Sequence, residues 1–304
     1  MKVLFAVSDG IGNIIECLPV VSTLEKSKGW DISFLMCDPS HMIPGSVLQR
    51  PTYTMSGIIP EGIESAFEGI IATGKAWDKL YDYHGSHINH VEHLLLNDPD
   101  TQRLKDVEKW ARSEVDWRLD MARELGIDDA DIKYRYHLNT TTAPTYNVVI
   151  CDGYNHNNTC QCWDVKSYPR WDEVAGGLHD HHRAMGICSV GIEGENVANT
   201  VDETGRSLDE SLGIIRNAEI VLSNDTGMYH AAALLGTTCV AVFTFTSVVK
   251  NHDKRFHRGC HVVKKHLKCQ ADCYETGHVR HCEKGHECQD IEPQRIINKV
   301  MELM

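Results

Sequence analysis

Short apolar runs alternate with helix-patterned segments along residues 146–243, and this alternation leaves the chain few possible folds. The predicted strands and helices, in chain order, cover residues 146–151, 171–182, 184–190, 208–217, 219–223, 228–235 and 238–243. A short run that is apolar throughout is typical of a strand buried on both faces, because helices cover both sides of a parallel sheet. The pattern therefore predicts a doubly wound α/β domain.

The N-terminus repeats this pattern. Residues 2–7 form an apolar run, a Gly-rich turn follows at residues 9–13, and a helical pattern extends over residues 14–28. Pro19 lies inside this pattern and predicts a helix that is kinked early or begins later. A second strand is expected at residues 32–37, which completes a strand–helix–strand unit.

The chain length of 304 residues fits two domains of about 150 residues each. We expect a helical, polar stretch over residues 60–130, with a strand start at residues 77–81. The polar segment 140–145 contains a turn signal at Pro144 and marks the boundary. The expected parts are an N-terminal domain over residues 1–143, a C-terminal domain over 144–290 with a Cys-rich segment at 260–288, and a last helix over 291–304.

Charge and hydropathy exclude several classes of protein. The formal net charge of −13 disfavours nucleic acid as the main partner, because phosphate contacts need a basic surface. No stretch approaches the roughly 18–20 apolar residues of a membrane span. The first residues lack the features of a secretory signal peptide. These observations favour a cytoplasmic protein whose twelve cysteines are thiols or metal ligands.

The segment 223–230 joins a buried strand to a helix and carries polar residues at the junction. Asp225, Thr226 and Gly227 occupy the turn, and His230 lies one helical turn later. Backbone N–H groups and the positive end of the helix dipole meet there, which favours binding of an anion such as phosphate. The structural alternative is a helix that Asp225 caps, which many such junctions contain.

Three motifs in this chain resemble those of one enzyme family. Residues 224–237 read Asn-Asp-Thr-Gly-x-x-His-x-Ala-Ala-x-x-Gly-Thr, residues 10–19 read Gly-Ile-Gly-Asn-Ile-Ile-x-x-x-Pro, and residues 166–171 read Lys-Ser-Tyr-Pro-Arg-Trp. In this order and spacing, they resemble the glycosyltransferase family that includes the ADP-heptose:lipopolysaccharide heptosyltransferases. The resemblance implies an α/β protein of the GT-B fold, in which two Rossmann-like, doubly wound domains face a central cleft.

The resemblance also implies a reaction. A nucleotide-diphosphate sugar, such as an ADP-sugar, would bind mainly to the C-terminal domain, and a hydroxyl acceptor to the N-terminal domain. Transfer would be inverting and would require no cofactor or catalytic metal, so that positive groups stabilise the leaving diphosphate. Lys166 would neutralise the diphosphate, with Arg170 as the alternative, and Gly12 would allow close backbone approach. The remaining residues expected at the donor phosphates and sugar are Asp225, Thr226, Gly227 and His230.

Asn13 departs from the family pattern. The matching position in the heptosyltransferases is an Asp that acts as the general base, and an Asn side chain cannot accept a proton at neutral pH. Asp9 on the same turn is the nearest candidate for the base, and Glu16 is a second candidate. Three functions stay open: a glycan-directed transferase, a transferase that modifies a protein or a modified DNA base, and a non-catalytic nucleotide-sugar-binding protein.

Cysteines are densest near the C-terminus. Cys269, Cys273, Cys282 and Cys288 lie within a short stretch that contains interleaved histidines. Four thiolates can hold zinc or iron tetrahedrally, and relatives in the family often carry a Cys-rich segment here. We expect either a structural metal site that clips a long loop or a set of reduced cysteines.

Overall fold

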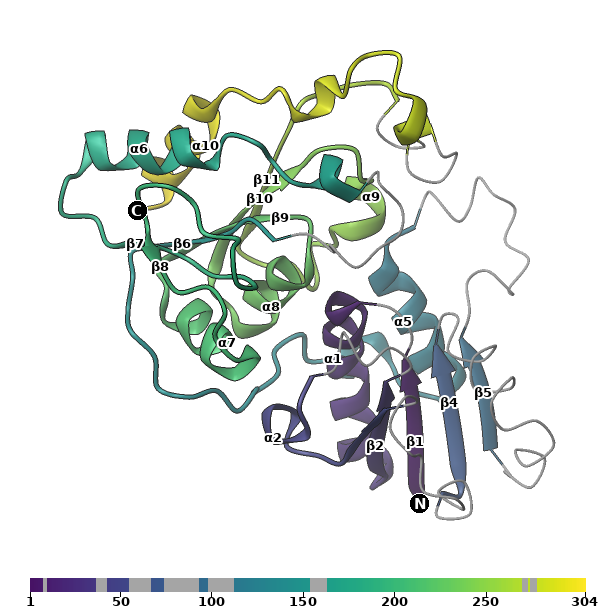
Figure 1. Cartoon of the computed structure of the whole chain (residues 1–304). Helices are drawn as coiled ribbons and strands as arrows, with labels where there is room; N and C mark the ends of the chain where they lie inside the picture. Colours follow the sequence, from purple (N-terminus) through teal and green to yellow (C-terminus); the bar gives the residue numbers. More distant parts are fainter. Residues whose placement is uncertain are drawn as a thin grey trace. The chain divides into compact units, whose positions relative to one another are not determined.

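The computed structural model describes residues 1–7, 10–36, 43–54, 67–73, 93–97, 112–153, 163–269, 273 and 278–304. The chain divides into two compact units, Met1–Asn139 and Thr140–Met304 (Figure 1). Residues 135–146, which contain the expected boundary at residue 143, form no helix or strand. No described helix is both long enough and apolar enough to cross a membrane.

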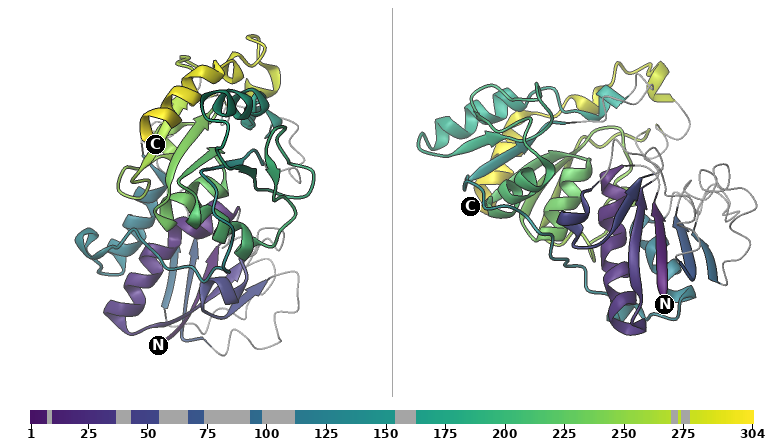
Figure 2. Two further views of the ribbon diagram at one scale, coloured as in Figure 1. Left: turned by 90° about the vertical axis from the view of Figure 1, so that its left-hand side faces the viewer. Right: turned by 60° about the horizontal axis from the view of Figure 1, so that its bottom comes forward.

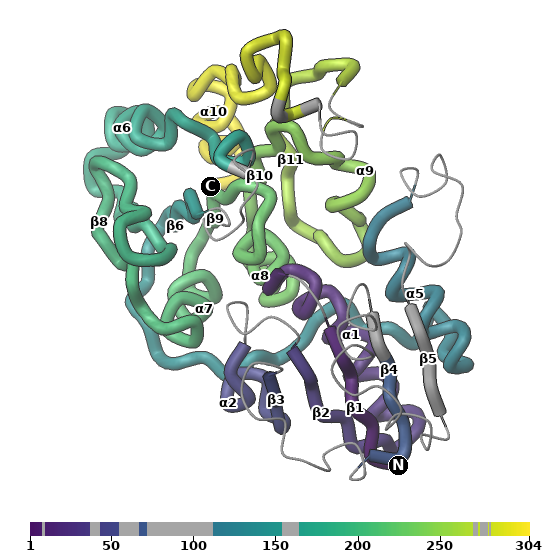
Figure 3. The backbone as a smooth tube through the Cα atoms, turned by 45° about the vertical axis from the view of Figure 1, so that its right-hand side comes forward, coloured from purple at the N-terminus to yellow at the C-terminus, as the bar shows by residue number. Residues whose placement is uncertain are grey.

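The first unit contains a five-stranded sheet in the order β3-β2-β1-β4-β5, in which every neighbouring pair is parallel. Figure 3 shows β3, β2 and β1 side by side. The elements are β1 (Lys2–Val7), α1 (Ile11–Lys28), β2 (Asp31–Met36), α2 (Gly45–Leu48), β3 (Thr52–Thr54), β4 (Gly69–Thr73), β5 (His93–Asn97), α5 (Glu114–Glu124) and the 3₁₀ turn η4 (Asp129–Asp131).

Helix α1 begins earlier than the sequence suggested, at Ile11 and not at residue 14, and Pro19 lies inside it. Proline removes one N–H donor from the helix interior, but the apolar face of α1 outweighs this loss. Ile14, Leu18 and Leu24 on that face are at most 1% exposed. The expectation of a later helix start was therefore wrong.

The helical interpretation of residues 60–130 was wrong for two segments. β4 pairs in parallel with β1, and β5 pairs with β4. Ile70 and Ile71 of β4 are 2% and 3% exposed, so the strand is buried although polar sequence surrounds it. A five-residue strand is too short for its periodicity to stand out from such surroundings. Residues 77–81 lie outside the described part of the chain.

The second unit contains a six-stranded sheet in the order β11-β10-β9-β6-β7-β8, again with parallel neighbours. The strands are β6 (Val148–Cys151), β7 (Ile187–Ser189), β8 (Val201–Asp202), β9 (Ile220–Asn224), β10 (Thr238–Phe243) and β11 (Cys260–Lys264). The helices are α6 (Trp171–His181), α7 (Leu208–Asn217), α8 (Gly227–Leu235), α9 (Val248–Asn251) and α10 (Pro293–Leu303), with 3₁₀ turns η5 (Trp163–Lys166), η6 (His278–His281) and η7 (Glu287–Gln289).

Alternate residues of the strands build two cores, one on each face of this sheet. Val148, Leu222 and Val242 pack with residues of α6 and α10. Val149 and Val221 are among the strand residues that pack with α7 and α8 on the other face. Figure 1 shows this three-layer arrangement, and Figures 1 and 2 show α10 beside α6. Because helices cover both faces of the sheet, its strands do not alternate between apolar and polar residues.

The connections of the second sheet reverse direction between β6 and β9. From β6 the chain moves outward to β7 and β8, then returns to the other side of β6 and builds β9, β10 and β11 in turn. In open α/β sheets, ligands bind at such a switch point, outside the carboxyl ends of the strands. The segment 223–230 lies at this edge, directly after β9.

Candidate functional site

The carboxyl ends of β6 and β9 lie next to each other, because these strands pair in parallel with Cys151 opposite Ser223. The chain beyond β6 continues into Asp152, and the chain beyond β9 continues through Asp225 into α8. Polar side chains that follow two adjacent parallel strands therefore meet at one edge of the sheet. This juxtaposition forms the framework of the candidate site.

Asn224 fastens the segment that carries Lys166 to this edge. Its side chain is fully buried, and its amide donates to the backbone oxygen of Asp152 at 2.7 Å. Its Oδ1 accepts from the backbone N–H of Tyr168 at 3.0 Å. Thr244, which follows β10, donates to the backbone oxygen of Lys166 at 3.4 Å. Lys166 is therefore held at the ends of three neighbouring strands.

Asp225 is a buried carboxylate that several polar side chains surround. It is 1% exposed, and its Oδ2 accepts from Asn251 Nδ2 at 2.7 Å and lies 3.6 Å from Lys166 Nζ. Burial alone would raise the pKa of Asp225, but the Lys166 ammonium, His230 and the Asn251 hydrogen bond together hold this pKa below its ordinary value. Asp225 is therefore ionised at neutral pH.

The N-cap of α8 is Thr226, not Asp225, so the capping alternative drawn from the sequence was wrong. The Thr226 carbonyl accepts from the N–H groups of Tyr229 and His230 at 3.1 and 3.4 Å. The amides of Gly227 and Met228 precede these bonds, in the first turn, where a helix offers its N–H groups to an outside acceptor. This end of α8 has the chemistry of a phosphate-binding turn.

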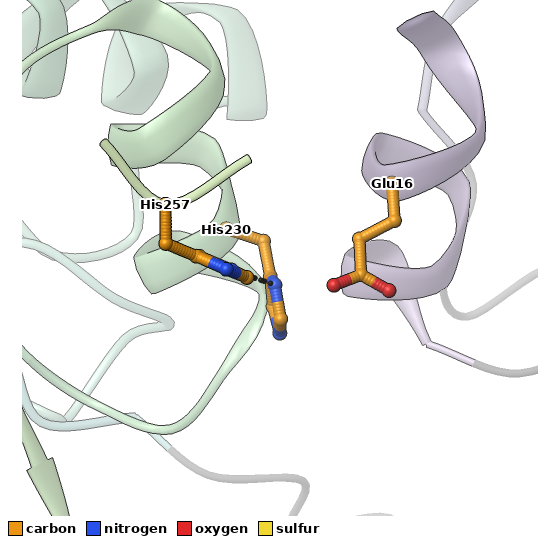
Figure 4. A group of neighbouring side chains, drawn as sticks. All are labelled: Glu16, His230 and His257. Carbon is orange, nitrogen blue, oxygen red and sulfur yellow. Dashed lines mark hydrogen bonds between the residues drawn. The ribbon is translucent and has the colours of Figure 1, made fainter. Parts of the chain in front are cut away.

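His230 lies in the first turn of α8, and its two ring nitrogens have different surroundings. Nε2 lies 4.0 Å from Asp225 Oδ1. Nδ1 forms a hydrogen bond of 3.0 Å with Nε2 of His257, a residue that follows α9 (Figure 4). His230 is 7% exposed.

Arg170 pairs with two carboxylates and not with Asp225. It is the N-cap residue of α6, and its guanidinium donates to both carboxylate oxygens of Glu173, at 2.7 and 2.9 Å. A second carboxylate, of Glu292, lies 3.7 Å from it. Of the two cations considered from the sequence, Lys166 is thus the one that lies beside Asp225.

The first-unit candidates lie at the start of α1. Gly12 and Asn13 are half-buried residues of its first turn, and the Asn13 N–H donates to the Gly10 carbonyl at 3.0 Å. Glu16 follows in the same helix and is 3% exposed. Asp9 lies outside the described residues. The identity of the base stays a prediction.

The four tail cysteines line one small cavity, with Phe245, Leu267 and His286 among its other walls. Burial raises the pKa of Cys273, and it raises the pKa of Cys288 to about 12, with neighbouring thiols adding to both shifts. No three of these thiols come within 4.8 Å of one another among the described residues. The metal site stays a prediction.

Motif reasoning missed Asn251 and His257. They contact Asp225 and His230, respectively, from the segment after β10. Neither belongs to a recognisable short pattern. Only tertiary folding brings them to the turn, so their position in the sequence offered no signal.

Two doubly wound α/β units, each built on a parallel sheet, are the units of the GT-B fold. A family model gives the enzyme class from the sequence. The chain belongs to glycosyltransferase family 9 (heptosyltransferase), whose model matches residues 116–281, more than half of the chain.

Solved structures give the same fold. The Escherichia coli ADP-heptose lipopolysaccharide heptosyltransferase II matches with 15% identity and a TM-score of 0.66, over 100% of this chain and 98% of its own. The E. coli heptosyltransferase WaaC with ADP matches with 14% identity and a TM-score of 0.65, over 100% of both chains. The E. coli iron-containing dodecameric glycosyltransferase TibC matches with 15% identity and a TM-score of 0.62, over 99% of this chain and 77% of its own. No curated protein sequence matches. The predicted fold, family and enzyme class are confirmed.

Proposed function

We propose that this glycosyltransferase moves a heptose-like sugar from an ADP-sugar to a hydroxyl acceptor, with inversion and without a catalytic metal. The observation that carries the proposal is the cation–carboxylate–helix arrangement of Lys166, Asp225 and the first turn of α8. Family membership supports the reaction class, and the solved heptosyltransferase WaaC carries ADP. Donor binding is assigned to the second unit and acceptor binding to the first.

Lys166 and the α8 turn supply the positive potential for the diphosphate. We assign the phosphate oxygens to the Gly227 amide, the Thr226 hydroxyl and the Lys166 ammonium. A carboxylate repels phosphate, so Asp225 does not serve as a phosphate contact; it orients Lys166. Its Oδ1 has no hydrogen-bond partner among the described residues, so it can accept a hydrogen bond from a sugar hydroxyl.

Transfer breaks the bond between the anomeric carbon and the β-phosphate oxygen and forms a bond from that carbon to the acceptor oxygen. The ADP that leaves carries the electron pair of the broken bond. Preorganised cations and N–H groups at that position stabilise the charge without a metal ion. The acceptor proton passes to a carboxylate, for which Asp9 remains the candidate because Asn13 cannot accept it.

The identity of the acceptor is inferred from the family and from the net charge, and not from the geometry of the site. A glycan hydroxyl is the first candidate because of the family. A protein hydroxyl or a modified DNA base is the alternative, and the net charge of −13 disfavours the DNA base. Asn13 itself favours a second function, a protein that binds the nucleotide sugar and does not turn it over.

Product analysis with purified protein, ADP-heptose and a panel of hydroxyl acceptors tests the proposal. We expect transfer, with kcat/KM lowered about a hundredfold in Lys166→Met, because one charge-stabilising group is lost. Arg170→Met is the matched control and retains activity, since Arg170 pairs with Glu173. Binding of ADP without transfer or donor hydrolysis would favour the non-catalytic function.

We also propose that the cysteine-lined cavity holds a structural zinc or iron ion. The donor set of four sulfurs with His286 nearby suits either metal, and TibC is an iron-containing glycosyltransferase. Metal analysis of the protein as purified tests this proposal, with Cys273→Ser as the perturbed site and the buried core thiol Cys239→Ser as the control. A protein without bound zinc or iron would contradict it.

A further inference from the structure

His257 is a buried histidine outside every motif of the chain, and both of its ring nitrogens have partners. It is 2% exposed. Its Nδ1 accepts from the backbone N–H of Asp253 at 2.9 Å. Its Nε2 lies 3.0 Å from Nδ1 of His230 (Figure 4). The two bonds form a chain that runs from the backbone to the α8 turn.

The direction of both hydrogen bonds follows from the first one, which the Asp253 N–H donates to Nδ1 of His257. A backbone N–H can only donate, so Nδ1 of His257 must be the unprotonated nitrogen of the ring. The Asp253 carbonyl also lies 3.2 Å from Nδ1, but it already accepts from the His257 N–H at 2.7 Å. A proton on Nδ1 would face the hydrogen of the Asp253 amide. In a neutral ring the proton is therefore on Nε2.

The surroundings of His257 keep its ring neutral. Tyr229 stacks on it with centroids 4.5 Å apart and an interplanar angle of 3°, and Phe256 meets it edge-on at 4.8 Å. Burial lowers the pKa of His257 to about 2, with His230 and His252 adding to the shift. Asp253 is the carboxylate nearest in sequence, and Arg255 pairs with it.

The second bond then has a fixed direction as well. Nε2–H of His257 donates to Nδ1 of His230, so Nδ1 of His230 is an acceptor and its proton lies on Nε2. This N–H is directed to the side of Asp225, whose Oδ1 lies 4.0 Å from Nε2. The opposite tautomer would turn a lone pair towards the carboxylate and would repel a bound phosphate.

We propose that His257 is a positioning residue that fixes His230 as its Nε2–H tautomer and so presents an N–H donor at the donor-binding turn. The consequence for the donor rests on the proposed function, whereas the tautomer of His230 does not. His257 acts through His230 and contacts no part of the donor itself.

Nitrogen-15 NMR of histidine-labelled protein reads each tautomer directly, because the protonated and unprotonated ring nitrogens differ widely in chemical shift. Signals of His230 and His257 are assigned by the loss of peaks in single His→Gln variants. We expect the Nε2–H form for both residues in the wild-type protein without ligand. Detection of an Nδ1–H or cationic His257 at pH 7 would overturn the proposal, and this measurement depends on no variant.

Two substitutions at His257 separate its hydrogen bond from its bulk. His257→Gln retains an N–H donor near the place of Nε2, whereas His257→Leu removes it. His252→Gln is the control, because His252 stacks on His257 and bonds to the Tyr229 hydroxyl without a bond to His230. The probe for affinity is ADP, measured by calorimetry.

We expect His230 to lose its pure Nε2–H form in His257→Leu and to retain it in His257→Gln and His252→Gln. Affinity for ADP should fall about tenfold in His257→Leu only, which corresponds to the lower end of the range for one hydrogen bond to a charged group. An unchanged His230 tautomer in His257→Leu would overturn the proposal. If His257→Leu does not fold, His257→Gln decides together with the wild-type spectrum. A His230 that keeps its Nε2–H form in His257→Gln supports the proposal, and a His230 that loses this form overturns it. Failure of the wild-type protein to bind ADP with the expected tautomers present would refute the donor assignment, not the positioning role.

Discussion

Lys166→Met removes a cation that lies 3.6 Å from a carboxylate exposed to only 1%. At this distance the attraction between two unit charges is about 4.6 kcal/mol for an effective dielectric constant of about 20. Desolvation offsets part of it, and Asn251 still bonds to Asp225 in the variant. We therefore expect the free energy of unfolding of the second unit to fall by about 2–3 kcal/mol at pH 7.

The dependence of this loss on pH follows from the pKa of Asp225. In the wild-type protein this pKa is lowered, so the ionised carboxylate stabilises the fold above its unfolded pKa of about 3.9, and this stabilisation disappears as pH falls through the folded pKa. Without Lys166 the largest influence that lowers this pKa is gone, so we expect burial to raise the pKa of Asp225 in the variant. As pH falls, protonation of Asp225 removes the uncompensated buried charge of the variant. The difference in free energy of unfolding between the wild-type protein and Lys166→Met should therefore shrink from pH 7 to pH 4.

Urea denaturation followed by circular dichroism measures both effects. Lys166→Met/Asp225→Asn should recover much of the lost stability, because the uncompensated charge is gone. Arg170→Met is the matched control and should lose less, since Arg170 pairs at the surface with Glu173. A loss in Lys166→Met no greater than in Arg170→Met, without recovery in the double variant, would refute the ion pair as the support of this site.

Three further substitutions test other parts of the account by urea denaturation. Asn224→Ala should cost about 2–4 kcal/mol, because it removes buried bonds to Asp152 and Tyr168, and a loss below about 1 kcal/mol would contradict their role. Tyr168→Phe should cost about 1 kcal/mol, since its hydroxyl donates to the buried Ile291 carbonyl at 2.7 Å, and an unchanged midpoint would count against that bond. Between pH 7 and pH 5 the free energy of unfolding should fall by about 2 kcal/mol less in His257→Gln than in the wild-type protein. The unfolded His257 gains a proton below its ordinary pKa of about 6.5, whereas the folded residue, with a pKa of about 2, does not. Parallel pH profiles of the two proteins would show that the folded His257 titrates normally.

Much of the second unit followed from local pattern. Residues 208–217 and 238–243, predicted from periodicity, coincide with α7 and β10. A capping box between Ser207 and Glu210 marks the start of α7. By contrast, 184–190 was predicted as a strand and only Ile187–Ser189 pairs, because strand ends depend on how far the neighbouring strand extends.

The sequence predicted which residue types occupy the turn at residues 223–230, but it did not predict their partners. Lys166 and Asp225 belong to different motifs, and nothing in either motif indicates that the two charges pair. Asn224 bonds to a residue 72 positions away, and Asn251 and His257 approach from beyond β10. Such contacts depend on strand order, which the sequence does not express locally. The strands β4 and β5 were missed for a related reason. β4 is defined by its pairing with β1, and β5 by its pairing with β4, and neither pairing leaves a local signal in the sequence.

A crystal structure of the protein with ADP tests the donor assignment most directly. We expect phosphate oxygens within hydrogen-bond distance of the Gly227 amide, the Thr226 hydroxyl and Lys166 Nζ, with His230 Nε2 directed at the same ligand. Arg170 should remain paired with Glu173. A diphosphate that lies away from the first turn of α8, or one that Arg170 binds in place of Lys166, would contradict the assignment of the donor to this turn.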